Sequence, residues 1–236
     1  YVDYIKDYTK MKVIYYGHDL HFLRLGREYE LTGDIHIKRE ADYWKSVELT
    51  MMHKAAVSYY PSYVEINAIH AIDGSIRAKA ITAYVYDTFL TDIRDDFAKR
   101  EGLLFVGGFA HPPNADAVLW FAREIFPGIR ERIPGIKFYV VGSKVTGEIQ
   151  ALGQEEGIVI KGFVSEEELK ELYSACKLVV VPLRYGAGVK GKVVEAIYHG
   201  APIVTTSTGA EGIPFVESVL EIADEPEAFA ERVAEL

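Results

Sequence analysis

Short apolar segments alternate with amphipathic segments along the whole chain, and this alternation restricts the fold more than any other feature. The clearest apolar segment is Lys177–Pro182, whose unbroken run of valines is typical of a parallel strand buried on both faces. Amphipathic stretches such as Asn114–Phe126 place Val118, Phe121 and Ile125 on one helical face. The pattern predicts an α/β protein with parallel sheets.

The same pattern places the individual elements. The expected strands are Lys12–Tyr16, Val57–Tyr60, Arg77–Ala83, Leu103–Val106, Lys137–Val141, Gly157–Ile160, Lys177–Pro182, Pro202–Thr206 and Val219–Ala223. The expected helices are Asp34–Ala55, Val64–Ala71, Asn114–Phe126, Glu166–Ser174, Val193–His199 and Glu225–Leu236. Because the charge-rich stretch Asp87–Gly102 separates two such series, we predict two βα domains, residues 1–96 and 97–236, with the N-terminal domain truncated.

Composition excludes several classes of function. A net charge of −9 argues against a nucleic-acid partner or an anionic membrane surface, so any anion site must be local. The single cysteine, Cys176, rules out an intramolecular disulfide and fits a reducing, cytoplasmic setting. We find no apolar run long enough for a transmembrane segment. Asp92, Asp95 and Asp96 fit a solvated charged segment, and we expect no metal site.

Three segments that follow expected strands are rich in glycine. They are Gly107–Gly108, Arg184–Lys192 and Thr205–Gly212. Glycine lets the backbone approach a ligand closely, and ligands of open parallel sheets bind beyond the carboxyl ends of the strands. These segments therefore predict a binding site at that edge of the C-terminal sheet.

The strongest feature is Gly186–Glu195, a glycine-rich loop that opens a helix. Helix N-termini attract anions, so Lys190 and Lys192 are best explained by a bound phosphate, the alternative being two solvated lysines. Glu195 lies one turn further on, where it is close enough to bind ribose hydroxyls, unless it faces solvent. A phosphotransferase P-loop needs Ser or Thr where this chain has Val193.

Residues from about 103 to 212 resemble the C-terminal domain of the family 4 (group 1) glycosyltransferases, which have the GT-B fold. The resemblance is carried by FVGGFAHPPNADAVLWF, by FYVVGS and by GFVSEEELKELYSACKLVVVPLRYGAGVKGKVVEAIYHGAPIVTTSTGAEGI. Tyr1–Asp87, with VIYYGHDLHFLR and YYPS, resembles the second half of the family's N-terminal domain. The fold implied is GT-B-like, with two Rossmann-like βα domains.

The resemblance implies retaining, metal-independent transfer of a sugar from a nucleotide-diphosphate donor to a polysaccharide, lipid-linked or protein acceptor. The catalytic residues implied are His18, Lys192 and Arg184, with His18 lining the cleft from the acceptor side unless it is a structural histidine. The donor-binding positions implied are Gly107, Gly108, Gly162, Val164, Gly188, Lys190, Lys192 and Glu195.

Two departures from the family pattern leave alternatives open. Ala187 stands where the family often has a sugar-contacting glutamate, and the loop Gly108–Asn114 lacks the family's Arg and Lys. The alternatives are a non-catalytic nucleotide-sugar-binding module of the same fold and a GT-B-fold sugar-nucleotide epimerase. The sequence leaves the base, the sugar, the acceptor and the oligomeric state open.

Overall fold

The structure is a computed structural model, and it describes residues 2–8, 11–88 and 97–236. The contacts divide the chain into two compact units. Unit 1 comprises Tyr1–Val85 with two short segments from later in the chain, Tyr185–Val189 and Glu211–Pro214. Unit 2 comprises the remainder, Tyr86–Arg184, Lys190–Ala210 and Phe215–Leu236.

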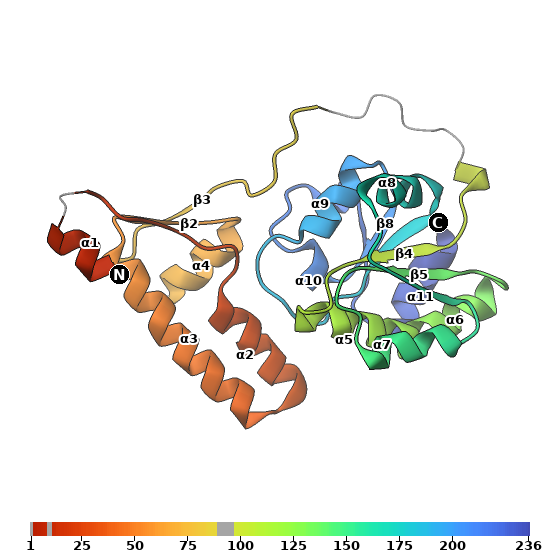
Figure 1. The fold of residues 1–236 in the computed structure, drawn as a ribbon, viewed down its shortest axis with the longest axis horizontal. Coiled ribbons are helices and arrows are strands. Elements are labelled where there is room, and N and C mark those ends of the chain that lie inside the picture. Colours follow the sequence, from red (N-terminus) through yellow and green to blue (C-terminus); the bar gives the residue numbers. More distant parts are fainter. Residues whose placement is uncertain (1, 9–10, 89–96) are drawn as a thin grey trace. The chain divides into compact units, whose positions relative to one another are not determined.

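Unit 1 is built on a three-stranded parallel sheet with the order β1-β2-β3. The strands are β1 (Ile14–Tyr16), β2 (Val57–Tyr60) and β3 (Ala78–Ala80). The helices are α1 (Val2–Tyr8), α2 (His21–Thr32), α3 (Ile35–Lys54) and α4 (Tyr63–Ile72). In Figure 1, α2 and α3 lie side by side as an antiparallel pair joined by a short turn. The core consists of Leu20, Met52, Tyr60, Ile66, Ile69 and Ile76.

Local signals fix the helix ends of unit 1. Gly33 adopts the left-handed conformation that ends α2, and Asp34 accepts the N–H of His36 at the start of α3. Ser62 is the N-cap of α4, and with Glu65 it forms a complete capping box. Helix α2 was not predicted. The predicted strand Arg77–Ala83 is regular only over β3.

Unit 2 is a six-stranded parallel sheet with the order β6-β5-β4-β7-β8-β9. Its strands are β4 (Leu103–Val106), β5 (Phe138–Val141), β6 (Ile158–Gly162), β7 (Leu178–Val181), β8 (Ile203–Thr205) and β9 (Glu221–Ile222). All four residues of β7 are buried, which confirms the prediction from the valine run. The strand order reverses between β4 and β7, and in open parallel sheets ligands bind beyond the carboxyl ends of the strands at such a switch point.

Helices cover both faces of this sheet. They are α5 (Pro112–Trp120), α6 (Phe126–Arg132), α7 (Gly147–Ala151), α8 (Glu166–Ala175), α9 (Gly191–Tyr198), α10 (Ser207–Ala210) and α11 (Pro226–Glu235). In Figure 1, α8 and α9 lie on one face, whereas α5, α6, α7 and α11 lie on the other. Phe121, Phe126, Phe138 and Phe229 pack together beneath this second group and form an aromatic core.

The predicted helix Asn114–Phe126 is longer in the structure. It begins at Pro112, widens into a π-helical turn over Phe121–Ile125, and continues as α6 to Arg132. The cause is Pro127, which has no N–H to donate to the preceding turn. The N–H of Phe126 bonds instead to the carbonyl of Phe121, five residues back. This register change keeps Phe121, Ile125 and Phe126 in the core.

The segment predicted to connect the domains lies partly outside the described residues, and so do Asp92, Asp95 and Asp96. Its described end contains a 3₁₀ turn, Phe97–Lys99, which leads into β4. The domain boundary between residues 96 and 97 stays a prediction.

Candidate functional site

Backbone packs against backbone where β4, β5 and β6 of unit 2 end. The N–H of Gly107 donates to the carbonyl of Val141, and the N–H of Gly142 donates to the carbonyl of Gly162. A Cβ on Gly142 would lie 1.9 Å from the carbonyl oxygen of Gly107. Only glycine fits at such an approach. Gly107, Gly142 and Gly162 therefore shape the edge where the sequence predicts a ligand, and we call it the glycine edge.

Lys192, in the first turn of α9, points at this glycine edge. Its ammonium donates to the side-chain carbonyl of Asn114 and lies 4.3 Å from the centroid of the Phe105 ring. A Cβ on Gly107 would lie 2.7 Å from the Lys192 ammonium. Asn114 also donates to the carbonyl of Gly108 at 2.8 Å. Asn114 thus connects the lysine to the loop that follows β4, although the sequence pattern did not single it out.

The ionisation of Lys192 is perturbed. Burial, and to a smaller extent the positive charge of the neighbouring Lys190, lower the pKa of Lys192 to about 7. Lys190 is itself only 8% exposed. Neither residue is the solvated surface lysine of the alternative interpretation. Two cations crowded at a helix N-terminus favour an anion beside them.

Glu195 lies one turn further along α9 and has a fixed partner. The hydroxyl of Tyr173, on α8, donates to Oε2 of Glu195 at 3.2 Å. Tyr173 is fully buried, and its ring stacks on that of His199 with 4.7 Å between the centroids. The alternative of a glutamate facing only solvent therefore does not hold.

Arg184 follows β7 and is held against α5. Its Nε donates to Asp116 at 3.0 Å, its Nη2 contacts the same carboxylate, and the guanidinium lies 5.7 Å from the centroid of the Trp120 ring. To contact a diphosphate, as predicted, Arg184 would have to leave Asp116 or to bind both anions at once. That aspartate was not predicted, because 68 residues separate it from Arg184.

The end of β6 and the loop after it contain two of the predicted donor-binding positions, Gly162 and Val164. Gly162 has a φ of 69°, which turns the chain sharply at the end of the strand. Phe163, between Gly162 and Val164, is 82% exposed. An exposed aromatic ring at this edge offers a flat apolar surface to a ligand.

His18 lies in unit 1, on the turn between β1 and α2, and is exposed. Its ring contacts Tyr16 edge to face, with 5.1 Å between the centroids. The N-terminus of α2 is anchored by Glu48 of α3, a buried residue that accepts the N–H groups of His21 and Phe22. Glu48 was not predicted, and it stabilises the helix that begins three residues after His18.

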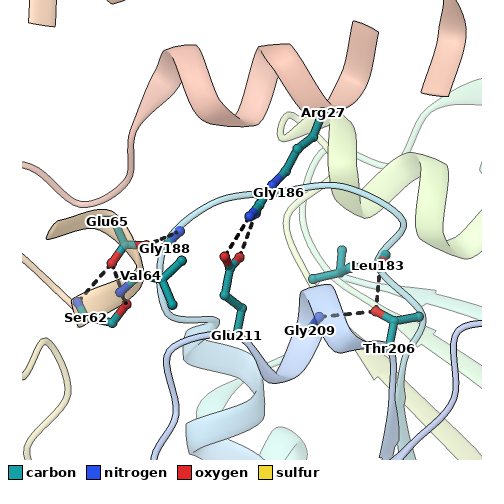
Figure 2. Close-up of polar contacts among 10 residues, drawn as sticks. All are labelled: Arg27, Ser62, Val64, Glu65, Leu183, Gly186, Gly188, Thr206, Gly209 and Glu211. Atoms are coloured by element: carbon teal, nitrogen blue, oxygen red, sulfur yellow. Dashed lines mark hydrogen bonds and ion pairs between the residues drawn. The ribbon is translucent and has the colours of Figure 1, made fainter. Parts of the chain in front are cut away.

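The glycine-rich segment Tyr185–Val189 also belongs to unit 1, where two charged residues hold it (Figure 2). Arg27 donates to the carbonyl of Gly186 at 2.6 Å and pairs with Glu211 through two bonds of 2.7 Å. The buried Glu65 accepts the N–H of Gly188 at 3.0 Å. A phosphate at Gly188, as predicted, would have to exchange with that carboxylate.

Thr206 of unit 2 links the loops that follow β7 and β8. Its hydroxyl donates to the carbonyl of Leu183 and accepts the N–H of Gly209 at 3.2 Å, as Figure 2 shows. A Cβ on Gly209 would lie 2.0 Å from the hydroxyl oxygen of Thr205. Gly209 therefore serves close packing within unit 2.

Comparison with known proteins now places the chain. The family described as "Glycosyl transferases group 1" matches residues 100–236, which is more than half of the sequence. This chain belongs to that family. The match covers the glycine edge, both lysines of α9 and Glu195, and so includes the candidate donor site of unit 2.

Two curated relatives extend the comparison. A 2-deoxystreptamine N-acetyl-D-glucosaminyltransferase of Niallia circulans is 23% identical over 200 residues, which cover 78% of this chain and 50% of that protein. An uncharacterized 44.6 kDa protein in the cps region of Klebsiella pneumoniae is 29% identical over 116 residues, which cover 47% of this chain and 30% of that protein. The chain thus spans half or less of the length of these relatives.

Solved structures share the fold. TarM matches with a TM-score of 0.73 and 14% identity, over 97% of this chain and 44% of that one. A sucrose-phosphate synthase from Thermosynechococcus elongatus matches with a TM-score of 0.73 and 17% identity, over 98% of this chain and 59% of that one. HepE of Anabaena, in complex with UDP and glucose, matches with a TM-score of 0.62 and 18% identity, over 96% of this chain and 61% of that one. The predicted α/β, GT-B-like fold with two parallel sheets is confirmed.

In the part of the chain that the structure describes, no helix combines the length and the apolar character needed to cross a membrane. Among the same residues, no group of three or more His, Cys, Asp or Glu side chains is placed to hold a metal ion.

Proposed function

We propose that this protein binds a nucleotide-diphosphate sugar through unit 2 and transfers the sugar, with retention, to an acceptor. The observation that carries the proposal is Lys192, a lysine held beside the glycine edge at the start of α9 with a pKa of about 7. A poorly solvated cation at a helix N-terminus is well suited to a diphosphate, because the negative charge of the bound anion stabilises the ammonium where water is excluded. Membership of the glycosyltransferase family supports the reaction type.

The chemistry follows from where charge develops. When the bond between the sugar and the diphosphate breaks, negative charge builds on the leaving oxygen. Lys192 and the first-turn amides of α9 would stabilise this charge, whereas Glu195 would hold the ribose. Arg184 would add positive charge beside the diphosphate if it binds the diphosphate and Asp116 at once. His18 remains a proposed catalytic residue, and Gly162 and Val164 would offer backbone groups to the base.

The ligands of related structures guide the choice of nucleotide to test. HepE was solved with UDP and glucose, and a pneumococcal O-GlcNAc transferase with UDP and GlcNAc, which makes UDP the first nucleotide to test. The relative from a cps region supports a polysaccharide acceptor. We propose no metal in the transfer, because lysine and helix-terminal amides supply the positive charge. A lipid-linked or a protein acceptor is tested alongside the polysaccharide.

The test is isothermal titration of the chain with UDP, GDP and ADP. The matched control is Lys137→Met, because Lys137 is an exposed lysine just before β5, at the opposite edge of the sheet. We expect one nucleotide to bind, Lys192→Met to weaken it at least tenfold and Lys137→Met to leave it unchanged. Equal affinity of the Lys192→Met variant would contradict the proposal.

A second candidate function is a binding module that does not catalyse. It is favoured by Ala187, and by the Gly188 N–H that donates to Glu65 within unit 1. Donor turnover separates the two candidates. Release of free sugar or its transfer, followed by NMR at the anomeric position, supports the enzyme, whereas tight binding without turnover supports the module. Conversion of the sugar without an acceptor would instead indicate the epimerase.

A further inference from the structure

Tyr173 of α8 is a fully buried tyrosine whose hydroxyl donates a hydrogen bond to Glu195. The bond joins the phenolic oxygen to Oε2 of the carboxylate at 3.2 Å and connects two neighbouring helices on one face of the unit 2 sheet. Burial raises the pKa of Tyr173, and the negative charge of Glu195 raises it further. The hydroxyl therefore keeps its proton and remains a donor to the carboxylate.

The tyrosine is fixed from a second side. Its ring stacks on His199 at an interplanar angle of 10°, and the N–H of His199 donates to the backbone carbonyl of Glu195 at 3.0 Å. Burial lowers the pKa of His199, so this ring is neutral near pH 7. Glu195 is thus restrained at its carboxylate by Tyr173 and at its backbone by the residue on which Tyr173 stacks.

We propose that Tyr173 is a positioning residue that presents the second carboxylate oxygen of Glu195 to the ribose hydroxyls of the donor. The inference rests on the proposed function. A carboxylate offers about four acceptor positions, so Oε2 can hold Tyr173 while Oε1 accepts from a ligand. Because a free glutamate side chain loses rotamer freedom when it binds, a preset carboxylate binds the ribose more tightly.

A purely structural role of Tyr173 would affect nucleotide binding differently. If the bond only satisfied a buried hydroxyl, its removal would loosen α8 and α9 and weaken every nucleotide alike. A positioning role is specific to the hydroxyls that Glu195 accepts. The two roles therefore separate in a comparison of UDP with 2′,3′-dideoxyuridine diphosphate, which lacks both ribose hydroxyls but keeps the base and the diphosphate.

The experiment measures both ligands by isothermal titration against the unaltered chain, Tyr173→Phe, Glu195→Gln and the double variant. Phenylalanine keeps the ring and its stack on His199, and urea unfolding of each variant confirms the fold. Tyr139→Phe, on β5, is the matched control. We expect Tyr173→Phe to weaken the binding of UDP about tenfold and the binding of the dideoxy ligand less than twofold. The double variant should bind UDP no more weakly than Glu195→Gln alone.

Equal weakening of both ligands assigns Tyr173 a structural role and overturns the inference, as does unchanged UDP affinity. Either result leaves the proposed function standing, provided that the unaltered chain binds UDP and Lys192→Met binds it at least tenfold more weakly. If the unaltered chain binds none of the tested nucleotides, the proposed function fails, and the inference fails with it.

Discussion

The pKa of Lys192 predicts how nucleotide binding depends on pH. With a pKa of about 7, half of the free protein carries a charged lysine at pH 7 and about 1% carries one at pH 9. If only the charged form binds a diphosphate, affinity falls about fiftyfold over this range, which corresponds to about 2.3 kcal/mol. The ligand adds little to the effect, because the second phosphate ionisation, with a pKa of about 6, is nearly complete by pH 7.

The assay is titration calorimetry of UDP from pH 6 to pH 9. Because the bound anion raises the pKa of Lys192, binding at pH 7 should take up about half a proton, which buffers of different ionisation enthalpy reveal. Lys192→Arg should bind with little pH dependence, since arginine stays charged, whereas Lys192→Met should bind weakly at every pH. A flat profile in the unaltered chain, or the same slope in Lys192→Met, would refute the reasoning.

Three further predictions concern stability, each measured by urea unfolding. Phe121→Ala should cost about 3–5 kcal/mol, because Phe121 is fully buried, whereas Phe163→Ala, at an 82% exposed position, should cost less than about 0.5 kcal/mol; similar losses would contradict the aromatic core. Gly142→Ala should cost about 2–3 kcal/mol, because the new Cβ meets the carbonyl of residue 107. Gly147→Ala, with no atom within 4 Å, should be neutral, and equal costs would refute the packing of the glycine edge. Glu65→Ala should cost about 3 kcal/mol, because it leaves the α4 N-cap and the residue 188 amide without their charged acceptor; a loss below about 1 kcal/mol would show that neither bond matters.

The fold was largely predictable because its signals are local. The valine run of β7 and the N-cap at Ser62 act within a few residues of the elements that they define. Helix α2 was missed for the opposite reason. Its N-cap position, Leu20, makes no side-chain hydrogen bond, and the acceptor for its first amides is Glu48, 27 residues further along the chain. A capping signal that arrives from another helix leaves no local pattern.

The candidate site was predictable only in outline. The glycine-rich loops and the position of Lys192 at a helix start can be recognised in the sequence, because glycine and a cation have few other reasons to occur there. The low pKa of Lys192 arises from burial and from the charge of Lys190, and the groups that surround its ammonium, Asn114 of α5 and Phe105 of β4, lie far away in the sequence. The partners of Glu195 and Arg184, Tyr173 and Asp116, lie 22 and 68 residues away and could not be assigned.

The assignment of Gly188 shows a further limit. Its glycine-rich context predicted an amide open to phosphate, whereas in unit 1 that amide donates to Glu65. One carboxylate oxygen of Glu65 serves the capping box with Ser62, while the other accepts the N–H of residue 188. A residue that serves two segments 123 positions apart is visible only in three dimensions.

The most direct test of the central claim is a crystal structure of the chain with UDP. We predict that the diphosphate lies within hydrogen-bonding distance of the Lys192 ammonium at the start of α9, with a ribose hydroxyl on Glu195. UDP bound elsewhere, or a diphosphate with no contact to Lys192, would contradict the account.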